Sequence, residues 1–263
     1  MNILMVGLDL NPPWVEGIRN SVRDISNGLI NHNHKVVFLT KGHSRHRAYE
    51  IIDGIKYYRI ITNSNAKYMS GYKEFLAKLF VYLPKIIKKE KINIVHAHSS
   101  YPFFGFMTFI TLKQKNIVKI FSLYSSMSYA PPFHYKSIVQ MLLDFSRKNY
   151  WLSLSSLDAV VAKSKRTYNL VSSIAPFSIF RKYTYIPIPI NFSKFFPKDS
   201  SKVKKELNIA QNKKVILFGG DLTPYKGADI FIYALSKLNK KYEKFHGIIL
   251  MKSIYERSDK RLS

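Results

Sequence analysis

The sequence predicts an α/β protein whose core is a parallel β-sheet. The first 40 residues already indicate this class, because an apolar run from Asn2 to Leu8 is followed by an amphipathic helix and a second apolar run, Val36 to Thr40. The helix is indicated by apolar residues at helical spacing, which are Ile18, Val22, Ile25 and Leu29. A strand–helix–strand unit of this kind joins parallel strands.

Further apolar runs extend the predicted sheet along the chain. We expect strands at 54–61, 92–97, 117–123 and 157–164. Helical spacing predicts helices over 72–89, 102–115 and 135–156. Residues 2–186 should therefore form one parallel sheet with helices on both faces, which is the usual environment of parallel strands.

A second unit of the same kind is predicted after the charged stretch from Lys198 to Lys205, and we place the domain boundary near residue 200. An apolar run, 215–218, meets a glycine pair that ends in Gly220, and Lys226 and Gly227 then precede a helical pattern. A strand over 245–251 follows. Glycines let a phosphate approach the backbone closely, and a helix N-terminus offers free N–H groups. The alternative is an ordinary turn with a surface lysine.

Composition bounds the classes of partner. The 263 residues allow two modest domains, and the absence of cysteine excludes a disulfide scaffold and a thiolate metal site. The formal net charge of +26 implies attraction to phosphate-bearing partners, namely anionic lipid, nucleic acid or a nucleotide sugar. The alternative is a set of solvated lysine-rich faces. Because no nucleic-acid recognition motif occurs, we expect no specific nucleic-acid partner.

The sequence also bears on location. The N-terminus has no basic region before its apolar run, so we interpret it as a first strand and expect a cytoplasmic protein. The most apolar stretch, Tyr101 to Leu112, is too short to cross a hydrocarbon core of about 30 Å. The helix predicted over 72–89 carries lysines at positions 73, 78, 85, 88 and 89. Such a face can lie on the inner, anionic surface of a membrane, or it can simply be solvated.

The glycine turn resembles the nucleotide-sugar half of the retaining glycosyltransferases of family 4, which have the GT-B fold of two facing Rossmann-like domains. The family pattern of apolar strand, glycine, short turn, lysine and glycine is matched at Gly220, Lys226 and Gly227. The resemblance implies that these three residues bind the donor. Asp221 stands where the family usually has an arginine that pairs with the donor diphosphate.

The resemblance extends through the first domain. The loop with Pro12 and Gly17 resembles the family's first loop, with Glu16 in place of a second glycine. His98 ends a segment similar to the family's strand-terminal His-x-His, and Tyr124 stands where the family usually has a histidine beside the reacting sugar. The resemblance implies that Glu16, Gly17, His98 and Tyr124 lie on the acceptor side or in the cleft. For His98, a packed structural histidine is the alternative.

The two histidines at 96 and 98 leave the same face of a strand and could in principle bind a metal. No carboxylate or cysteine follows at ligand spacing, so we predict no metal site. The family works without a metal-binding motif, and we expect no cofactor beyond the nucleotide-diphosphate sugar that serves as donor substrate.

The resemblance implies an enzyme that moves a sugar, with retention, from a nucleotide-diphosphate sugar to a hydroxyl of a sugar or lipid-linked acceptor in cell-envelope glycan or glycolipid synthesis. Residues 1–200 match its acceptor-side domain. Residues 201–263 match the first βαβ part of its nucleotide-sugar domain, and the family's Glu-x7-Glu loop does not follow Lys226. We therefore expect a truncated or inactive form. The alternative is a non-catalytic partner subunit or a remnant of a split glycosyltransferase, with a separate chain supplying the rest of the donor domain.

Overall fold

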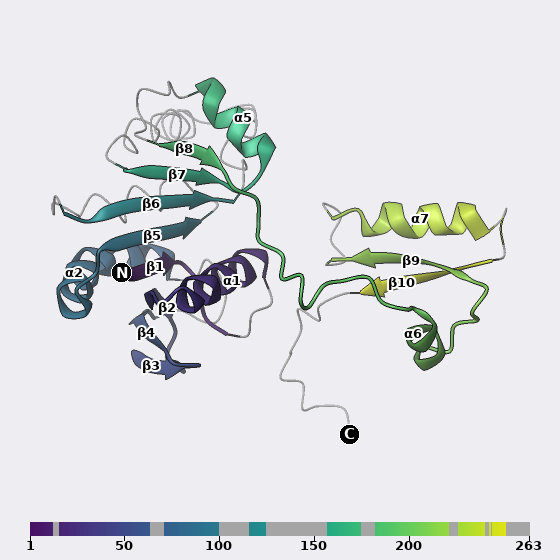
Figure 1. Ribbon diagram of the computed structural model, residues 1–263, viewed down its shortest axis with the longest axis horizontal. Helices are drawn as coiled ribbons and strands as arrows, with labels where there is room; N and C mark the ends of the chain where they lie inside the picture. Colours follow the sequence, from purple (N-terminus) through teal and green to yellow (C-terminus); the bar gives the residue numbers. More distant parts are fainter. Residues whose placement is uncertain are drawn as a thin grey trace. The chain divides into compact units, whose positions relative to one another are not determined.

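The protein divides into two compact units, Met1–Phe192 and Ser193–Ser263, and each is described by itself. The structure is a computed structural model, shown in Figure 1. It describes residues 1–12, 16–63, 71–99, 116–124, 157–174, 182–220, 226–239, 242 and 244–250. The helices predicted over 102–115 and 135–156 lie outside these residues, as do Pro13 and Asp221. The boundary near residue 200 and the roles assigned to the two domains remain predictions.

Among the described residues of the first unit, eight strands form one sheet in the order β3-β4-β2-β1-β5-β6-β7-β8. Its strands are β1 (Asn2–Gly7), β2 (Lys35–Gly42), β3 (Tyr49–Ile52), β4 (Ile55–Ile61), β5 (Ile94–Ser99), β6 (Val118–Leu123), β7 (Ala159–Ala162) and β8 (Tyr183–Tyr185). All neighbouring pairs except β3 and β4 are parallel. Strands β8, β7, β6 and β5 lie one below another in the upper part of Figure 1. The predicted parallel α/β fold is confirmed.

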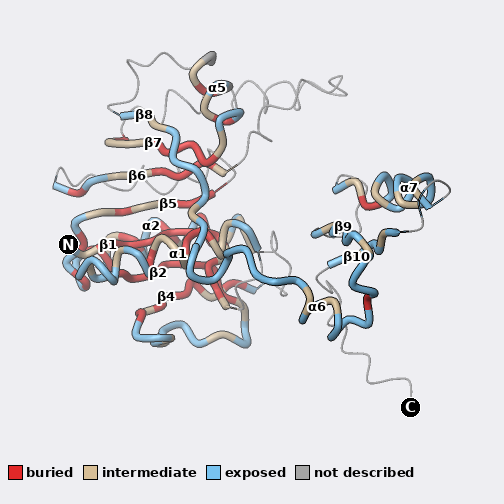
Figure 2. Tube along the Cα trace, turned by 45° about the vertical axis from the view of Figure 1, so that its right-hand side comes forward, coloured by how far each residue is buried: buried red, intermediate tan, exposed pale blue. Residues whose placement is uncertain are grey.

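Helices cover both faces of this sheet, because alternate residues of each strand point to opposite sides. One face packs against α1 (Gly17–Asn31), where Val22 joins a cluster with Met5 and Phe38. The other face packs against α2 (Tyr72–Glu90) and α5 (Lys165–Ile174), and its cluster includes Leu79 and Val171. Figure 2 shows buried residues concentrated along β1, β2 and β5. The central strands are therefore buried on both faces.

The expectation of an entirely parallel sheet is wrong at one edge. Strand β3, which was not predicted, pairs antiparallel with β4 through a two-residue turn of Asp53 and Gly54. These residues have φ angles of 50° and 78°. Two successive residues in the left-handed region form the tight turn that matches the twist of a hairpin. The Asp53-Gly54 turn therefore lets the chain reverse direction, so that β3 forms an antiparallel edge strand.

The amino ends of the strands carry an ion cluster around Glu90, the last residue of α2. Its side chain is 2% exposed and accepts hydrogen bonds from Lys35 Nζ at 2.7 Å, Lys56 Nζ at 3.1 Å and the Tyr58 hydroxyl at 2.6 Å. Burial alone raises the pKa of the Glu90 carboxyl, but these hydrogen bonds outweigh burial and lower the pKa to about 2. This Glu90 cluster fastens α2 to β2 and β4.

The second unit contains the strand–helix–strand pattern that the sequence predicts. Strand β9 (Lys214–Gly219) pairs in parallel with β10 (Phe245–Leu250), and α7 (Ala228–Asn239) connects them along the chain. A short helix, α6 (Ser201–Glu206), lies in the stretch interpreted as a charged boundary. In Figure 2 this unit is mostly exposed or intermediate. A two-stranded parallel sheet carries the candidate donor turn.

Candidate substrate-binding sites

Two of the predicted site residues, His98 and Tyr124, meet at the carboxyl edge of the first sheet. His98 lies on β5, and Tyr124 follows β6 directly. Nδ1 of His98 lies 3.3 Å from the Tyr124 hydroxyl, which in turn donates a hydrogen bond of 3.1 Å to Ser21 on α1. Nε2 of His98 lies 3.3 Å from Sδ of Met5. Both ring nitrogens of His98 therefore contact protein atoms, and we name His98, Tyr124 and Ser21 the His98 relay.

A second histidine stacks on the relay. The rings of His96 and His98 have centroids 3.9 Å apart, and Nε2 of His96 lies 2.8 Å from the Ser122 hydroxyl. Burial, together with the charge of Lys163, lowers the pKa of His96 to about 3. Burial, His96 and Lys163 hold the pKa of His98 well below its usual range. Both imidazoles are therefore neutral at physiological pH and act through hydrogen bonds rather than charge.

Tyr124 is held in its neutral form as well. Burial raises the pKa of its phenol to about 12, against the smaller lowering effect of the hydrogen bond to Ser21. A phenol of this kind can donate and accept hydrogen bonds but does not act as a base near neutral pH. The relay is therefore an uncharged network that orients its own members.

The predicted residues Glu16 and Gly17 lie at the start of α1. Glu16 occupies the N-cap position without a side-chain cap hydrogen bond, and its carboxylate is 3.6 Å from Nη2 of Arg19. A methyl group added at Gly17 would meet no described atom within 4 Å. No atom of the described residues therefore crowds the backbone at Gly17. Ser21 on the same helix ties this turn to the His98 relay.

A cationic group at the ends of β1, β2 and β4 was not predicted. Arg19 pairs with Asp9, and Nε of Arg59 donates to Oδ1 of Asn11 at 2.6 Å. Asn11 also donates to the carbonyl oxygen of Lys41 at 2.8 Å. Burial is the main cause that lowers the pKa of Lys41. These contacts of Asp9 and Asn11 attach the segment that follows β1 to α1, β2 and β4.

The three predicted donor residues come together in the second unit, at the carboxyl end of β9. The amide of Gly220 donates to the Leu250 carbonyl at 3.0 Å, and a Cβ built on Gly220 would lie 3.9 Å from Cβ of Lys226. Gly227 has a φ of +76°, which favours glycine, and precedes the first residue of α7. The turn therefore places a lysine and the N-terminus of a helix beside the end of a strand.

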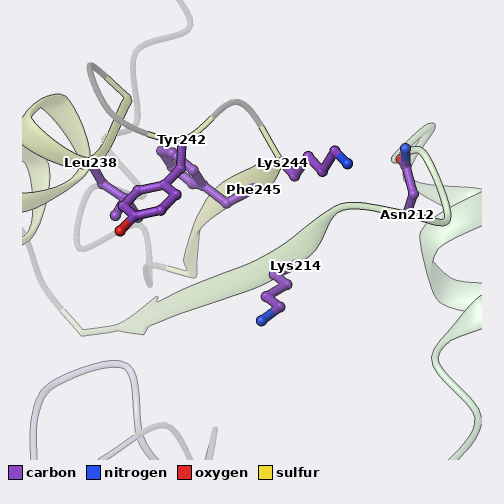
Figure 3. A pocket seen from close by; sticks show the side chains of 6 residues that line it. All are labelled: Asn212, Lys214, Leu238, Tyr242, Lys244 and Phe245. Atoms are coloured by element: carbon purple, nitrogen blue, oxygen red, sulfur yellow. The ribbon is translucent and has the colours of Figure 1, made fainter.

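A cavity of 430 Å³ in the second unit lies at the opposite end of β9 (Figure 3). Its lining consists of Asn212, Lys214, Leu238, Tyr242, Lys244 and Phe245. Lys214 and Lys244 point away from each other in this view, so they do not converge on one ligand. The cavity lies at the amino end of the strand and is separate from the glycine turn.

The described residues contain neither a candidate metal site nor a candidate membrane-spanning helix. Within these ranges no group of three His, Asp or Glu side chains gathers around a common point where an ion would fit. Nor does any helix that the structure describes combine the length and apolar character needed to span a membrane.

Lys163 is a further candidate at the carboxyl edge of the first sheet, and it was not predicted from the sequence. It follows β7 immediately, and the sequence signal was a charged residue directly after the apolar run Ala159–Ala162. Ligands of parallel α/β proteins bind outside the carboxyl ends of strands, so a lysine at this position is a candidate on general grounds. Ser21 gave no comparable signal, because its role depends on the packing of α1.

Solved structures that share the fold include a sucrose-phosphate synthase, a protein in complex with UDP and a UDP-N-acetylglucosamine 2-epimerase. The chain superimposes on the sucrose-phosphate synthase of Thermosynechococcus elongatus with a TM-score of 0.66 and 15% identity, covering 95% of this chain and 70% of the other. It matches the Anabaena protein HepE in complex with UDP with a TM-score of 0.60 and 15% identity, covering 96% of this chain and 62% of the other. The first unit and the start of the second therefore have the GT-B fold.

The chain belongs to Glycosyltransferase Family 4, whose family model matches residues 15–193. It is also similar to an uncharacterised glycosyltransferase of Methanocaldococcus jannaschii, with 24% identity over 255 residues. That alignment covers 92% of this chain and 61% of the archaeal protein, so the chain spans about three fifths of the length of this relative. The family predicted from the sequence is confirmed.

Proposed function

We propose that the protein is a glycosyltransferase that moves a sugar, with retention, from a nucleotide-diphosphate sugar to an acceptor hydroxyl in the synthesis of a cell-envelope glycan or glycolipid. The observation that carries the proposal is the turn between β9 and α7, where Gly220, Lys226 and Gly227 lie together at a helix N-terminus. Membership of Glycosyltransferase Family 4 and the UDP bound by HepE support a nucleotide sugar as the donor.

Leaving-group stabilisation is the chemical task of the donor turn. As the bond to the sugar breaks, negative charge develops on the diphosphate, and fixed positive groups lower the energy of this state. Lys226 supplies a full charge, and the N-terminus of α7 supplies N–H groups and the positive end of the helix dipole. Gly220 leaves the backbone open to a phosphate. No metal is part of this proposal.

The acceptor side is proposed in the first unit. No described atom crowds Gly17, and Glu16 lies next to it at the start of α1. The neutral His98 and Tyr124 hold the end of the sheet in place through Ser21. In this proposal Glu16 and Gly17 contact a sugar or lipid-linked acceptor, while His98 and Tyr124 position the loops around it.

Nucleotide binding tests the donor site directly. We expect calorimetry to show binding of uridine or guanosine diphosphate by the full chain and a loss of at least about tenfold in affinity on Lys226→Met, because a charge-assisted contact to phosphate is removed. Lys237→Met is the matched control, since Lys237 is exposed in the last turn of the same helix. Equal losses in the two variants would contradict a specific role for Lys226.

A non-catalytic partner subunit is the second candidate function. The observation that favours it is Tyr124, whose high pKa and two hydrogen bonds leave no titrating group where the family usually has a histidine. Such a subunit would bind a separate chain that supplies the remaining donor-domain elements. Sugar transfer by the purified chain would exclude this candidate.

Membrane association is proposed for the exposed face of α2, on the inner surface of a cytoplasmic membrane. Two of the five predicted lysines are engaged elsewhere: Lys78 donates to Glu74 at 2.6 Å, and Lys89 lies over the rings of Tyr49 and Tyr58. The exposed residues of α2 include Lys73, Phe80, Val81, Tyr82, Lys85 and Lys88. Aromatic and basic side chains together are typical of helices that lie in a membrane interface.

Vesicle flotation tests this surface. A lysine near an anionic bilayer contributes about 1 kcal/mol, so Lys85→Gln should weaken binding to vesicles with anionic lipid about fivefold. Lys182→Gln is the control and should leave vesicle binding unchanged. Lys182 is exposed and directly precedes β8, which is an edge strand of the sheet. Equal binding of the unmodified protein to neutral and anionic vesicles would remove the electrostatic basis of the proposal.

A further inference from the structure

Lys163 is a buried cation without a counter-charge among the described residues. It follows β7, and its amide donates to the carbonyl of Leu123 at 2.9 Å, which continues the ladder between β6 and β7. The residue is only 7% exposed. None of the ion pairs that the described residues form includes Lys163. A buried charge of this kind destabilises a protein unless a partner compensates it.

The neighbours of Lys163 on the sheet are neutral. Tyr124 and Lys163 each lie one residue beyond the pair Leu123 and Ala162, so both belong to the sheet face that carries His98. Lys163 is close enough to His96 and His98 to lower the pKa of each. The Tyr124 hydroxyl already donates a hydrogen bond to Ser21. These side chains therefore supply hydrogen bonds but no negative charge.

Most of the acidic residues that the structure describes in the first unit form ion pairs with cations other than Lys163. The first unit contains nine Asp and Glu in its sequence, and of these Asp144 lies outside the described ranges. Ion pairs with other cations involve Asp9, Glu16, Asp24, Glu50, Glu74 and Glu90. Burial lowers the pKa of Lys163, and no carboxylate of the described residues opposes this shift. The compensating anion is therefore expected from a ligand.

A second positive feature lies beside Lys163. Helix α5, labelled in Figure 1, begins at Lys165, two residues later. It contains ten residues. Ser164 caps it, because its hydroxyl oxygen accepts a hydrogen bond from the Thr167 amide at 3.0 Å. The first N–H groups of a helix point toward the side from which an anion approaches, and the helix dipole adds to the charge of a nearby lysine.

We propose that Lys163 is a specificity residue that binds a phosphate group of the acceptor. The inference rests on the proposed function, since it takes the first unit as the acceptor side. A phosphate supplies the missing counter-charge and matches a lysine next to a helix N-terminus in charge and in hydrogen bonding. An acceptor with a phosphomonoester or a diphosphate therefore binds in preference to its uncharged analogue.

Calorimetry with glycerol 3-phosphate tests this subsite on the full chain. Lys163→Met keeps the length and bulk of the side chain and should weaken binding at least about tenfold. Lys165→Met is the matched control, because it removes the same charge from an exposed position two residues away and should change the affinity less than about twofold. Unchanged binding in Lys163→Met would overturn the proposal.

Thermal stability separates ligand binding from a structural role. Without phosphate, Lys163→Met should melt about 2 °C or more above the unmodified protein, because an uncompensated buried charge is gone. A structural lysine would instead give a lower melting temperature when it is replaced, and that result would overturn the proposal.

The source of the phosphate is tested with uridine diphosphate. We expect Lys163→Met to lose affinity for glycerol 3-phosphate but to bind uridine diphosphate as the unmodified protein does. Lys226→Met should lose affinity for uridine diphosphate but bind glycerol 3-phosphate normally. A loss of uridine diphosphate alone in Lys163→Met would assign the lysine to the donor and overturn the acceptor assignment. If the unmodified chain binds glycerol 3-phosphate through Lys163 but no nucleotide, the proposed donor site fails while the phosphate subsite stands.

Discussion

Glu90→Gln is expected to destabilise the first unit by about 2–3 kcal/mol at neutral pH. The variant keeps the shape of the side chain but removes the charge that holds Lys35, Lys56 and Tyr58. The expected cost lies at or below the range for a fully buried pair, because the two lysines are 44% and 34% exposed. Denaturant unfolding followed by circular dichroism measures it, and hydrogen exchange in β2 and β4 locates the effect.

The difference between the two proteins should depend on pH. The Glu90 carboxyl has a pKa of about 2 in the folded protein and an ordinary value of 4.5. A carboxyl whose pKa is lowered by folding contributes stability above its unfolded pKa and loses it as the pH falls toward the folded value. The advantage of the unmodified protein should therefore be complete above about pH 5.5 and disappear near pH 2.

Glu74→Gln is the matched control for this experiment. It makes the same substitution on the same helix, but the Glu74–Lys78 pair is at the surface, so its effect should be much smaller. A loss of stability in Glu90→Gln that stays constant from pH 7 to about pH 2 would contradict the role assigned to the carboxylate charge.

Asp221→Arg is expected to tighten nucleotide binding by up to several hundredfold. Asp221 follows Gly220 in the sequence and lies outside the described residues, so this expectation comes from the sequence. The family usually has an arginine there, and an acidic group a few ångströms from a diphosphate costs about 1–4 kcal/mol. Since tenfold in affinity corresponds to about 1.4 kcal/mol, the upper limit is several hundredfold.

Calorimetry with uridine and guanosine diphosphates measures this change. Glu206→Arg adds the same two units of charge at the end of α6 and controls for the general increase in net charge. Equal gains in the two variants would show that the effect is a general one. Weaker nucleotide binding by Asp221→Arg would contradict the prediction, because it would show that Asp221 favours nucleotide binding.

The regular parts of the fold could be predicted because their signal is local. The apolar runs at β5 and β6 and the helical spacing of α1 and α2 place these elements to within about two residues of their bounds. β8 has only three residues, too few to show a period. β3 depends on the turn at Asp53 and Gly54, and this signal was not used.

The candidate site could be predicted only in part. His98 and the glycine turn were found because they end strands, and ends of strands are visible in a sequence. The partners of His98 come from α1 and β6, which lie far away in the chain, so no local pattern indicates them. Lys78 and Lys89 show the same limit, because their contacts with Glu74, Tyr49 and Tyr58 depend on packing.

The two ends of the first sheet carry different kinds of polar group, and this arrangement bears on how the protein can evolve. The Glu90 cluster lies where β2 and β4 begin, whereas the His98 relay and Lys163 lie where β5, β6 and β7 end. Stability and substrate preference can thus change through separate substitutions, since residues far apart usually contribute independently. A directed-evolution library restricted to the strand ends that hold Lys163 would leave the Glu90 cluster unchanged, so its contribution to stability would be kept.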